Sequence, residues 1–440
     1  MADKPLTAGG GKSLVIRQIA TVVLLFGGYA ALYFCRADLS VATPLLVREL
    51  GRHGVSPPAA LVHIGYLSSY GVLAYALGKL FLTGLGDFWG GRVNFLIGLA
   101  GATAFTLMFA LGGALPIFTL AWLGNRLTQS VAWAGLLKVS SRWFDYSSHG
   151  AIIGILSVSY LIGDALARRS MGALLAAGYG WRSLFYFAAA VAGALFAANF
   201  SLLRETRTAS GHREAQPHPL NLFAGAQQPP ASIGALLSPL LRSRAYQLVC
   251  LLSLGCTIIR ETFNNWTPMY LHDTLGFSTA SAANMSAIFP GVGVVSVLVT
   301  GWLSDRLGAN GRSLLLCVGL TATVAALVAL MMLRPGTGSA LPLAAIGTIA
   351  FCLLGPYSYL GGAFALDFGG KQAGAMSSGI IDGVGYLGAV FAGGSVAKIA
   401  VSLGWKGVFA ALAGVCVLTA FGAGALYLHG ARTQAQGSRS

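Results

Sequence analysis

Long apolar segments, interrupted by short polar stretches rich in Gly and Pro, follow one another along the whole chain. Each apolar segment has about 20 residues or more, which is enough for one helix to cross a hydrocarbon core of roughly 30 Å. Cutting the chain at the polar breaks predicts twelve helices. Their ranges are 15–48, 60–86, 92–114, 116–140, 150–178, 182–203, 244–272, 280–306, 312–333, 340–366, 373–400 and 405–429.

The composition places these helices in a lipid bilayer. Of the 440 residues, 55% are hydrophobic and only 9% are charged, which differs strongly from water-soluble proteins. The first helix is longer than the apolar region of a signal peptide and has no small-residue cleavage site, so we expect it to be retained. The predicted fold class is an all-α membrane protein with twelve transmembrane helices.

A polar segment with Pro, His and charged residues divides the chain almost in half and has the composition of a linker. The predicted units are a cytoplasmic tail (1–14), a six-helix bundle (15–204), a cytoplasmic linker (205–243), a second six-helix bundle (244–430) and a cytoplasmic tail (431–440).

Basic residues are distributed unequally between the two ends of the predicted helices. Twelve helices put both termini and the linker on one side, which carries fifteen Lys and Arg residues against eight on the other, Arg168 among the eight. Because basic loops stay in the cytoplasm, we expect cytoplasmic termini and a location in the inner (plasma) membrane. The net charge of +15 is explained in the same way and requires no nucleic-acid partner.

The two halves of the chain repeat one another. Arg36 and Arg260 each stand seven residues before a Thr-Pro pair, and Gly-Trp dipeptides beginning at Gly180 and Gly404 share the same offset of 224 residues. This parallel repeat of six helices resembles the organisation of the major facilitator transporters, in which the solute binds near the midplane between the halves. The repeat therefore predicts a site at the interface of the two bundles.

Five basic residues fall inside predicted helices, where a central Arg or Lys costs roughly 2.5 to 3.5 kcal/mol on insertion scales. Such residues usually face a cavity. They are Arg36, Lys79, Arg126, Lys138 and Arg260. Arg126 and Lys138 lie nearer the helix ends, and for Arg126 we favour a structural role.

Arg36 and Arg260 are repeat mates, so the pseudo-two-fold axis places them opposite each other at similar depth. Two guanidinium groups in this arrangement suit one small anion, because each presents a planar fork to phosphate oxygens. The alternative is that each arginine pairs with a nearby acid, Asp38 or Glu261, to hold helices together.

Lys79 lies about two turns inward from the end of the second helix, where it supplies a third positive charge or extends toward the lipid headgroups. Tyr29 and Tyr33 precede Arg36 by seven and three residues, which places all three on one helical face. Their hydroxyls line the cavity or serve packing.

Two short loops, after the second and the eighth helix, carry matching residues. Asp87 and Arg92 in the first loop correspond to Asp305 and Arg312 in the second. An Asp at a helix end binds helix N-termini and arginines of a neighbouring helix. Because the pattern occurs twice, it predicts a conformational latch for the outward-open state.

The first helix resembles that of the organophosphate:phosphate antiporters, the family of glycerol-3-phosphate and hexose-phosphate transporters. Its pattern of two tyrosines, an arginine and a proline eight residues later is matched by Tyr29, Tyr33, Arg36 and Pro44. The likeness extends over nearly the whole chain. It includes Lys79, Gln129, Trp133, Arg260, Trp266 and Tyr386.

The resemblance implies exchange of internal inorganic phosphate for an external organic phosphate, held by the two arginines of the first and seventh helices. It adds Gln129, Trp133 and Tyr386 as substrate-binding candidates and favours Lys138, which falls where relatives carry a basic residue. Tyr160 stands where the glycerol-3-phosphate transporter has a histidine, and it donates a hydrogen bond without titrating near neutral pH.

We expect alternating access of the two bundles around this site. One alternative is a proton-coupled carrier of another organic anion, with Asp164, Asp382 or Glu261 as the titrating carboxylate. Another is a membrane sensor of sugar phosphates, against which we count the short C-terminal tail and the lack of an added cytoplasmic domain.

Neither an enzyme nor a cofactor is indicated. The chain has no nucleophile elbow, no phosphate-binding GxxxxGK[ST] loop and no HExxH motif. Its six cysteines are scattered without CxxC or CxxH spacing, so we expect no metal site. The expected partners are a small phosphorylated solute, inorganic phosphate and the lipid bilayer, and a monomer is expected by analogy with the superfamily.

Overall fold

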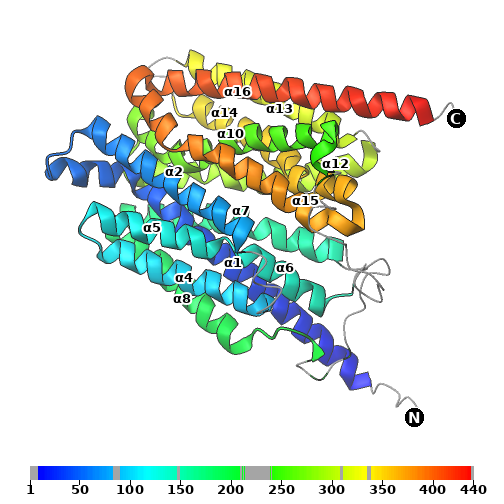
Figure 1. Cartoon of the computed structure of the whole chain (residues 1–440). Coiled ribbons are helices and arrows are strands. Elements are labelled where there is room, and N and C mark those ends of the chain that lie inside the picture. The colour runs from blue at the N-terminus through cyan, green and yellow to red at the C-terminus, as the bar shows by residue number, and fades with distance from the viewer. Residues whose placement is uncertain are drawn as a thin grey trace, which may run out of the picture.

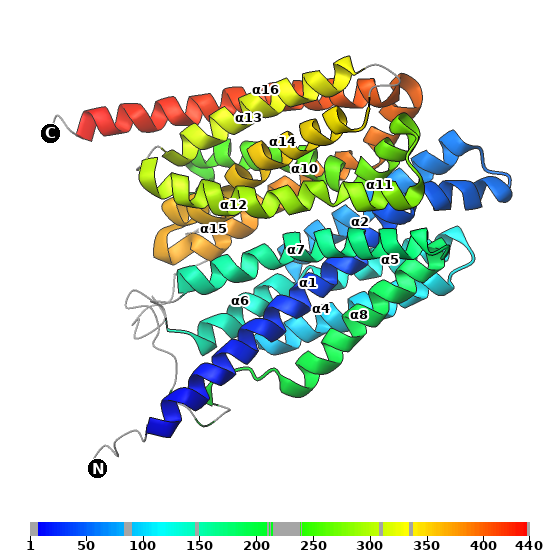
Figure 2. The same ribbon diagram turned by 180° about the vertical axis from the view of Figure 1, so that it is seen from behind.

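A computed structural model describes residues 8–82, 90–145, 149–208, 211, 213, 238, 240–307, 311–333 and 338–437. The helices form two bodies that lie side by side (Figures 1 and 2). The first comprises α1 (Ala8–Arg52), α2 (Pro57–Phe81), α4 (Gly91–Leu111), α5 (Leu115–Gln129), α6 (Ala132–Trp143), α7 (His149–Ala176) and α8 (Trp181–Leu202). The second comprises α10 (Arg244–Leu275), α11 (Thr279–Ser286), α12 (Ile288–Leu307), α13 (Gly311–Met332), α14 (Ala340–Tyr357), α15 (Ala365–Ala389) and α16 (Gly394–Gly437).

Several predicted helices are divided in the structure, among them the one predicted over 373–400, which a 3-10 turn (Val390–Ala392) separates into the end of α15 and the start of α16. The segment predicted over 116–140 ends as α5 at Gln129 and resumes as α6 at Ala132, and the segment predicted over 280–306 is divided between α11 and α12. A single-helix prediction is wrong for all three, because hydropathy does not register a short break inside an apolar stretch. The break after Gln129 leaves the end of α5 in the interior of its bundle.

The predicted ends differ elsewhere too. Helix α1 begins at Ala8, inside the predicted tail, and the loop expected at 367–372 is helical, since a π-turn (Leu360–Phe364) leads directly into α15. The break expected between the last two spans is present. It falls at Gly404 within α16, whose φ of 69° is open to glycine at little steric cost.

In the described part of the chain, eight helices are long and apolar enough to cross a membrane. All the described elements are helices or their connections, as expected for a spanning protein whose backbone polar groups must be paired within each segment.

The repeat is visible at the interface, where residues separated by the repeat offset contact each other. The Ser40 hydroxyl donates to the Asn264 carbonyl at 2.9 Å, and Nη2 of Arg48 lies 3.1 Å from Nε2 of His272; both pairs are 224 residues apart. Mates can meet only near a two-fold axis, so the pseudo-symmetry axis passes between α1 and α10.

Small residues let the bundles approach closely at a second place, where α2 crosses the start of α16. A Cβ added to Gly393 would lie 2.4 Å from the carbonyl oxygen of Gly65. The Ser69 hydroxyl accepts from the amide of Gly394 at 2.9 Å in the same crossing. This crossing and the Arg48–His272 contact lie toward the end of the molecule that carries the α1–α2 connection, opposite the chain termini (Figure 1).

Candidate functional site

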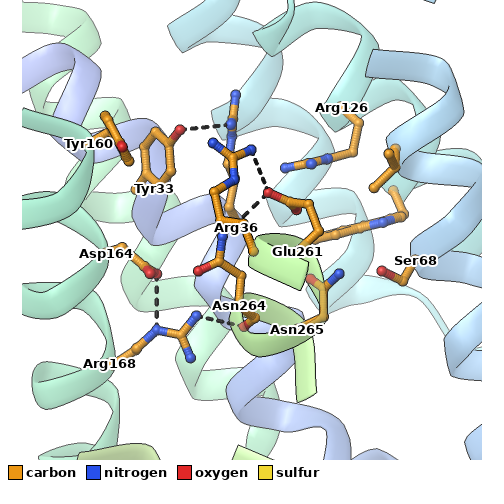
Figure 3. A pocket seen from close by; sticks show the side chains of 13 residues that line it. Tyr33, Arg36, Ser68, Arg126, Tyr160, Asp164, Arg168, Glu261, Asn264 and Asn265 are labelled. Atoms are coloured by element: carbon orange, nitrogen blue, oxygen red, sulfur yellow. Dashed lines mark hydrogen bonds and ion pairs between the residues drawn. The ribbon is translucent and has the colours of Figure 1, made fainter. Parts of the chain in front are cut away.

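A cavity lies between the bundles, where α1, α2, α5 and α7 face α10 (Figure 3). Its empty volume, including space open to solvent, is about 520 Å³. The lining residues are Tyr33, Arg36, Ser68, Val72, Trp122, Arg126, Tyr160, Asp164, Arg168, Arg260, Glu261, Asn264 and Asn265. Ionisable side chains inside a membrane protein are expensive, so this concentration of charge marks a site.

Arg36 projects from the middle of α1 and is held from two sides. Its Nε donates to Oε1 of Gln129 at 2.6 Å, and its Nη1 donates to the Tyr33 hydroxyl at 3.1 Å. The guanidinium also lies 4.6 Å from the centre of the Tyr75 ring. Nη2 is buried and has no protein partner, so it is available to an anion.

Arg260, the repeat mate on α10, lines the same cavity. Its Nη2 donates to Glu261 at 2.7 Å and to the Tyr386 hydroxyl at 3.0 Å, and its guanidinium lies 4.6 Å from the centre of the Tyr357 ring. Nε is buried without a partner. The arginine–acid pairing foreseen as an alternative is thus formed by Arg260 and Glu261.

Asp38, the acid near Arg36 in the sequence, is placed differently from Glu261. Its side chain is fully buried, and Oδ1 accepts a hydrogen bond from the amide of Leu39 at 2.7 Å. It is not among the residues that line the cavity.

Arg126 belongs to the cavity, although the sequence favoured a structural role for it. It is 5% exposed, lies in the last turn of α5 and has a buried Nε without a partner. Its guanidinium lies 5.2 Å from the centre of the Tyr75 ring and 5.8 Å from that of Trp122. The residue is indeed near a helix end, but the break after α5 places that end in the interior of the bundle.

Lys79 turns inward rather than toward the headgroups. Its ammonium group pairs with Asp382 on α15 at 3.0 Å, and it lies 5.6 Å and 5.4 Å from the ring centres of Tyr75 and Tyr386. The pair joins the two bundles beside the cavity but does not line it.

The predicted aromatic residues form a wall around the arginines. Tyr33 and Tyr160 are in contact with ring centres 5.4 Å apart, and Tyr29 lies 5.1 Å from Trp133 behind them. Tyr386 reaches the site through its hydrogen bond to the guanidinium of Arg260.

Tyr75 is a central residue that the sequence analysis missed. Its ring is approached by the guanidinium groups of Arg36 and Arg126 and by the ammonium group of Lys79. The sequence spacing would have indicated it, because Tyr75 stands four residues before Lys79 and therefore shares its helical face.

Arg168, counted from the sequence among the eight basic residues on the side opposite the termini, is buried between the helices and does not lie in a loop. It is 2% exposed, and its Nε pairs with Asp164 at 3.1 Å. Its Nη1 donates to Ser286 at 3.2 Å and its Nη2 to the carbonyl of Asn264 at 2.7 Å, so it links α7 to α10 and α11. The i,i+4 spacing of Asp164 and Arg168 would have indicated the pair.

Other predicted residues lie elsewhere. Lys138 is on α6 beside α4 and does not line the cavity. Arg92 anchors the start of α4, where its Nε donates to the carbonyl of Leu203 at 2.7 Å. Asp87 and the side chain of Asp305 lie outside the described residues, so the latch stays a prediction, as does the role of Arg312 on α13.

Paired helical bundles around a charged central cavity define a secondary transporter. The chain belongs to the Major Facilitator Superfamily, whose family model matches residues 25–393.

Individual relatives indicate a more specific group within this superfamily. The chain is 26% identical to a "Probable hexose phosphate transport protein" of Chlamydia trachomatis, over 90% of this chain and 88% of the relative. It is 27% identical to the "Membrane sensor protein UhpC" of Salmonella typhimurium, over 89% and 87%. These relatives confirm the resemblance to the organophosphate:phosphate antiporters. The fold matches that of a bacterial homologue of the human lysosomal transporter Spinster with a TM-score of 0.73, at 16% identity and over 95% and 97% of the two chains.

Proposed function

We propose that this protein exchanges an organic phosphate for inorganic phosphate across the membrane by alternating access. The observation that carries the proposal is the pair of repeat mates Arg36 and Arg260, which line one cavity from opposite bundles. Each has a buried guanidinium nitrogen without a protein partner. Two such groups bind a phosphate through charge-assisted hydrogen bonds. The name of the hexose phosphate relative supports the same solute class.

Exchange follows from the charges of the site. In an empty cavity Arg36, Arg126 and Arg260 carry more positive charge than Glu261 offsets, and a bound phosphate replaces their mutual repulsion with attraction. Reorientation is then favourable only for the loaded carrier, which gives exchange instead of leak.

The contacts between the bundles support alternating access. Arg48–His272 and the α2–α16 crossing close the end opposite the chain termini, and Arg168–Ser286 joins the bundles beside the cavity. With the termini in the cytoplasm, as the positive-inside rule predicts, this closed end faces outward. Transport then requires these contacts to separate in the outward-facing state.

Phosphate self-exchange tests the proposal. Purified protein in liposomes preloaded with phosphate should take up labelled phosphate, with glucose 6-phosphate and glycerol 3-phosphate as competitors. Arg36→Ala and Arg260→Ala should each lower exchange by at least about a hundredfold, because a lost charge-assisted contact at a buried anion costs about 3 kcal/mol. Arg169→Ala on α7, which removes an exposed arginine, is the matched control. Absence of exchange by folded protein would reject phosphate antiport.

The proton-coupled carrier remains the second candidate, because the ion pair of Lys79 and Asp382 joins the two bundles. Carboxylates inside the membrane-spanning part of transporters are the groups that form proton relays. Uptake into phosphate-free liposomes, driven by a pH gradient and abolished by Asp382→Asn, would favour this candidate. Exchange that is independent of the gradient would exclude it. A protein that binds sugar phosphates and transports none would fit the sensor.

A further inference from the structure

Arg126 and Glu261 enter the cavity from opposite bundles, one from α5 and the other from α10 (Figure 3). Only 5% of Arg126 and 7% of Glu261 is exposed, so both charges are held away from bulk water. Nε of Arg126 has no partner. The hydrogen bonds that Glu261 accepts from Arg260 (2.7 Å) and Asn264 (3.3 Å) both end on Oε1. Binding of phosphate by two repeat mates requires neither an added cation nor an added acid, so the presence of Arg126 and of Glu261, whose ion pair is with Arg260, needs its own explanation.

The net charge of the residues that line the cavity explains why Arg126 and Glu261 are both present. Asp164 and Arg168 form an ion pair of their own at 3.1 Å and contribute no net charge. The remaining charged lining residues are Arg36, Arg126, Arg260 and Glu261, with a net charge of +2. In a buried site an uncompensated charge is strongly unfavourable, so such a lining is matched by a solute with two negative charges.

We propose that Arg126 is a third anion-binding residue, and that Glu261, paired with Arg260, offsets one of the three arginine charges so that the cavity selects phosphate monoesters whose organic part is uncharged. The inference rests on the proposed function and specifies its substrate class. A monoester is a dianion above its second pKa of about 6. A phosphorylated carboxylic acid carries one negative charge more, and a phosphorylated amine one fewer.

The neighbouring amides fit an organic part with hydroxyl groups. Asn264 and Asn265 continue the lining along α10 beside Glu261, and Nδ2 of Asn265 is buried without a partner. A carboxylate and amides in one wall accept from and donate to the hydroxyls of a polyol. A free amide donor of this kind favours a hydroxylated solute over a purely apolar ester.

Three small solutes that differ in charge more than in size test this selectivity. Glycerol 3-phosphate and 3-phosphoglycerate share a three-carbon skeleton but differ by one carboxylate, and phosphoethanolamine carries an added ammonium group. Each is used at about pH 8 to inhibit phosphate self-exchange in liposomes. Wild-type protein should bind glycerol 3-phosphate at least about tenfold more tightly than either of the others.

Single-charge variants should shift this preference in opposite directions. Glu261→Gln raises the net charge of the cavity by one unit. It should raise the affinity for 3-phosphoglycerate at least about tenfold relative to the affinity for glycerol 3-phosphate. Arg126→Gln lowers the net charge by one unit and should raise the affinity for phosphoethanolamine by a similar factor relative to glycerol 3-phosphate. The double variant Arg126→Gln/Glu261→Gln restores the charge and should return the wild-type order. Arg126→Lys keeps the charge and should keep the order.

A merely structural role would lower all three affinities together, leave their order unchanged and give no recovery in the double variant; that result would overturn the inference. If Arg126→Gln does not fold, as judged by gel filtration, Glu261→Gln and the wild-type order decide by themselves. Wild-type protein that does not exchange phosphate at all rejects the proposed function. Phosphate exchange with an order insensitive to these substitutions rejects the inference alone.

Discussion

At the scale of single residues, the cavity depends on side chains that hold its arginines in place. Gln129 accepts from Nε of Arg36 at 2.6 Å and donates to Oδ1 of Asn125 at 2.6 Å. This second bond sets the orientation of the amide, so that its oxygen faces Arg36. With Nε and Nη1 engaged by the protein, the guanidinium presents Nη2 to the cavity.

Gln129→Met removes this acceptor with little change in volume. A hydrogen bond to a charged group contributes about 1.5 to 3 kcal/mol, so we expect the half-saturation concentration for phosphate exchange to rise at least about tenfold. Initial-rate measurements over a range of phosphate concentrations check it. Gln18→Met on α1, which loses a bond to the Trp143 carbonyl (3.1 Å), is the control and should keep wild-type half-saturation. Equal behaviour of the two variants would exclude an orienting role for Gln129.

At the scale of the helices, short breaks and small residues decide which side chains meet. The break after Gln129 lets α5 end inside its bundle, where the cation of Arg126 is favoured by the C-terminal dipole of that helix. Small residues act at the crossing of α2 and α16, where Gly65 and Gly393 bring the two backbones together.

Gly393→Ala tests this crossing. The added methyl group would lie 2.4 Å from the Gly65 oxygen, and overpacking of this kind costs about 1 to 3 kcal/mol. We expect a lower melting temperature and reduced phosphate exchange, measured by thermal unfolding in detergent and by flux in liposomes. Gly414→Ala is the matched control, because no atom lies within 4 Å of its added Cβ. A Gly393→Ala protein as stable and active as the control would contradict the packing argument.

At the scale of the whole molecule, the two bundles are closed at one end by contacts between repeat mates. Because Arg48 and His272 lie 3.1 Å apart at this end, alternating access requires them to separate. The buried Arg168 links the bundles further along the same interface.

A covalent cross-link between the two bundles at this end should stop transport. In a background with the six native cysteines replaced, Arg48→Cys/His272→Cys treated with a short bifunctional thiol reagent should lose at least about nine-tenths of its phosphate exchange, and reduction should restore it. Each single cysteine variant, treated identically, should retain its exchange. Full exchange by the cross-linked protein would show that this end does not open during the cycle.

The sequence by itself determined the membrane class, most of the helices, the repeat, and the expectation that Arg36 and Arg260 face a cavity between the bundles, as they do in the structure. The reason is that the hydropathy of a segment and the spacing of a repeat can both be read along the chain. The sequence identified Lys79 as inward-facing only as one of two alternatives, since the acid that pairs with it, Asp382, is 303 residues away.

Only the tertiary structure decided that Arg126, Arg168 and Tyr75 belong to or adjoin the site. The physical reason is that hydropathy measures the cost of placing a charge in a membrane but not the direction in which its side chain points. That direction depends on a helix break in α5 and on which helices of the other bundle pack against it. The pairing of charges across the interface is therefore a property of the folded protein.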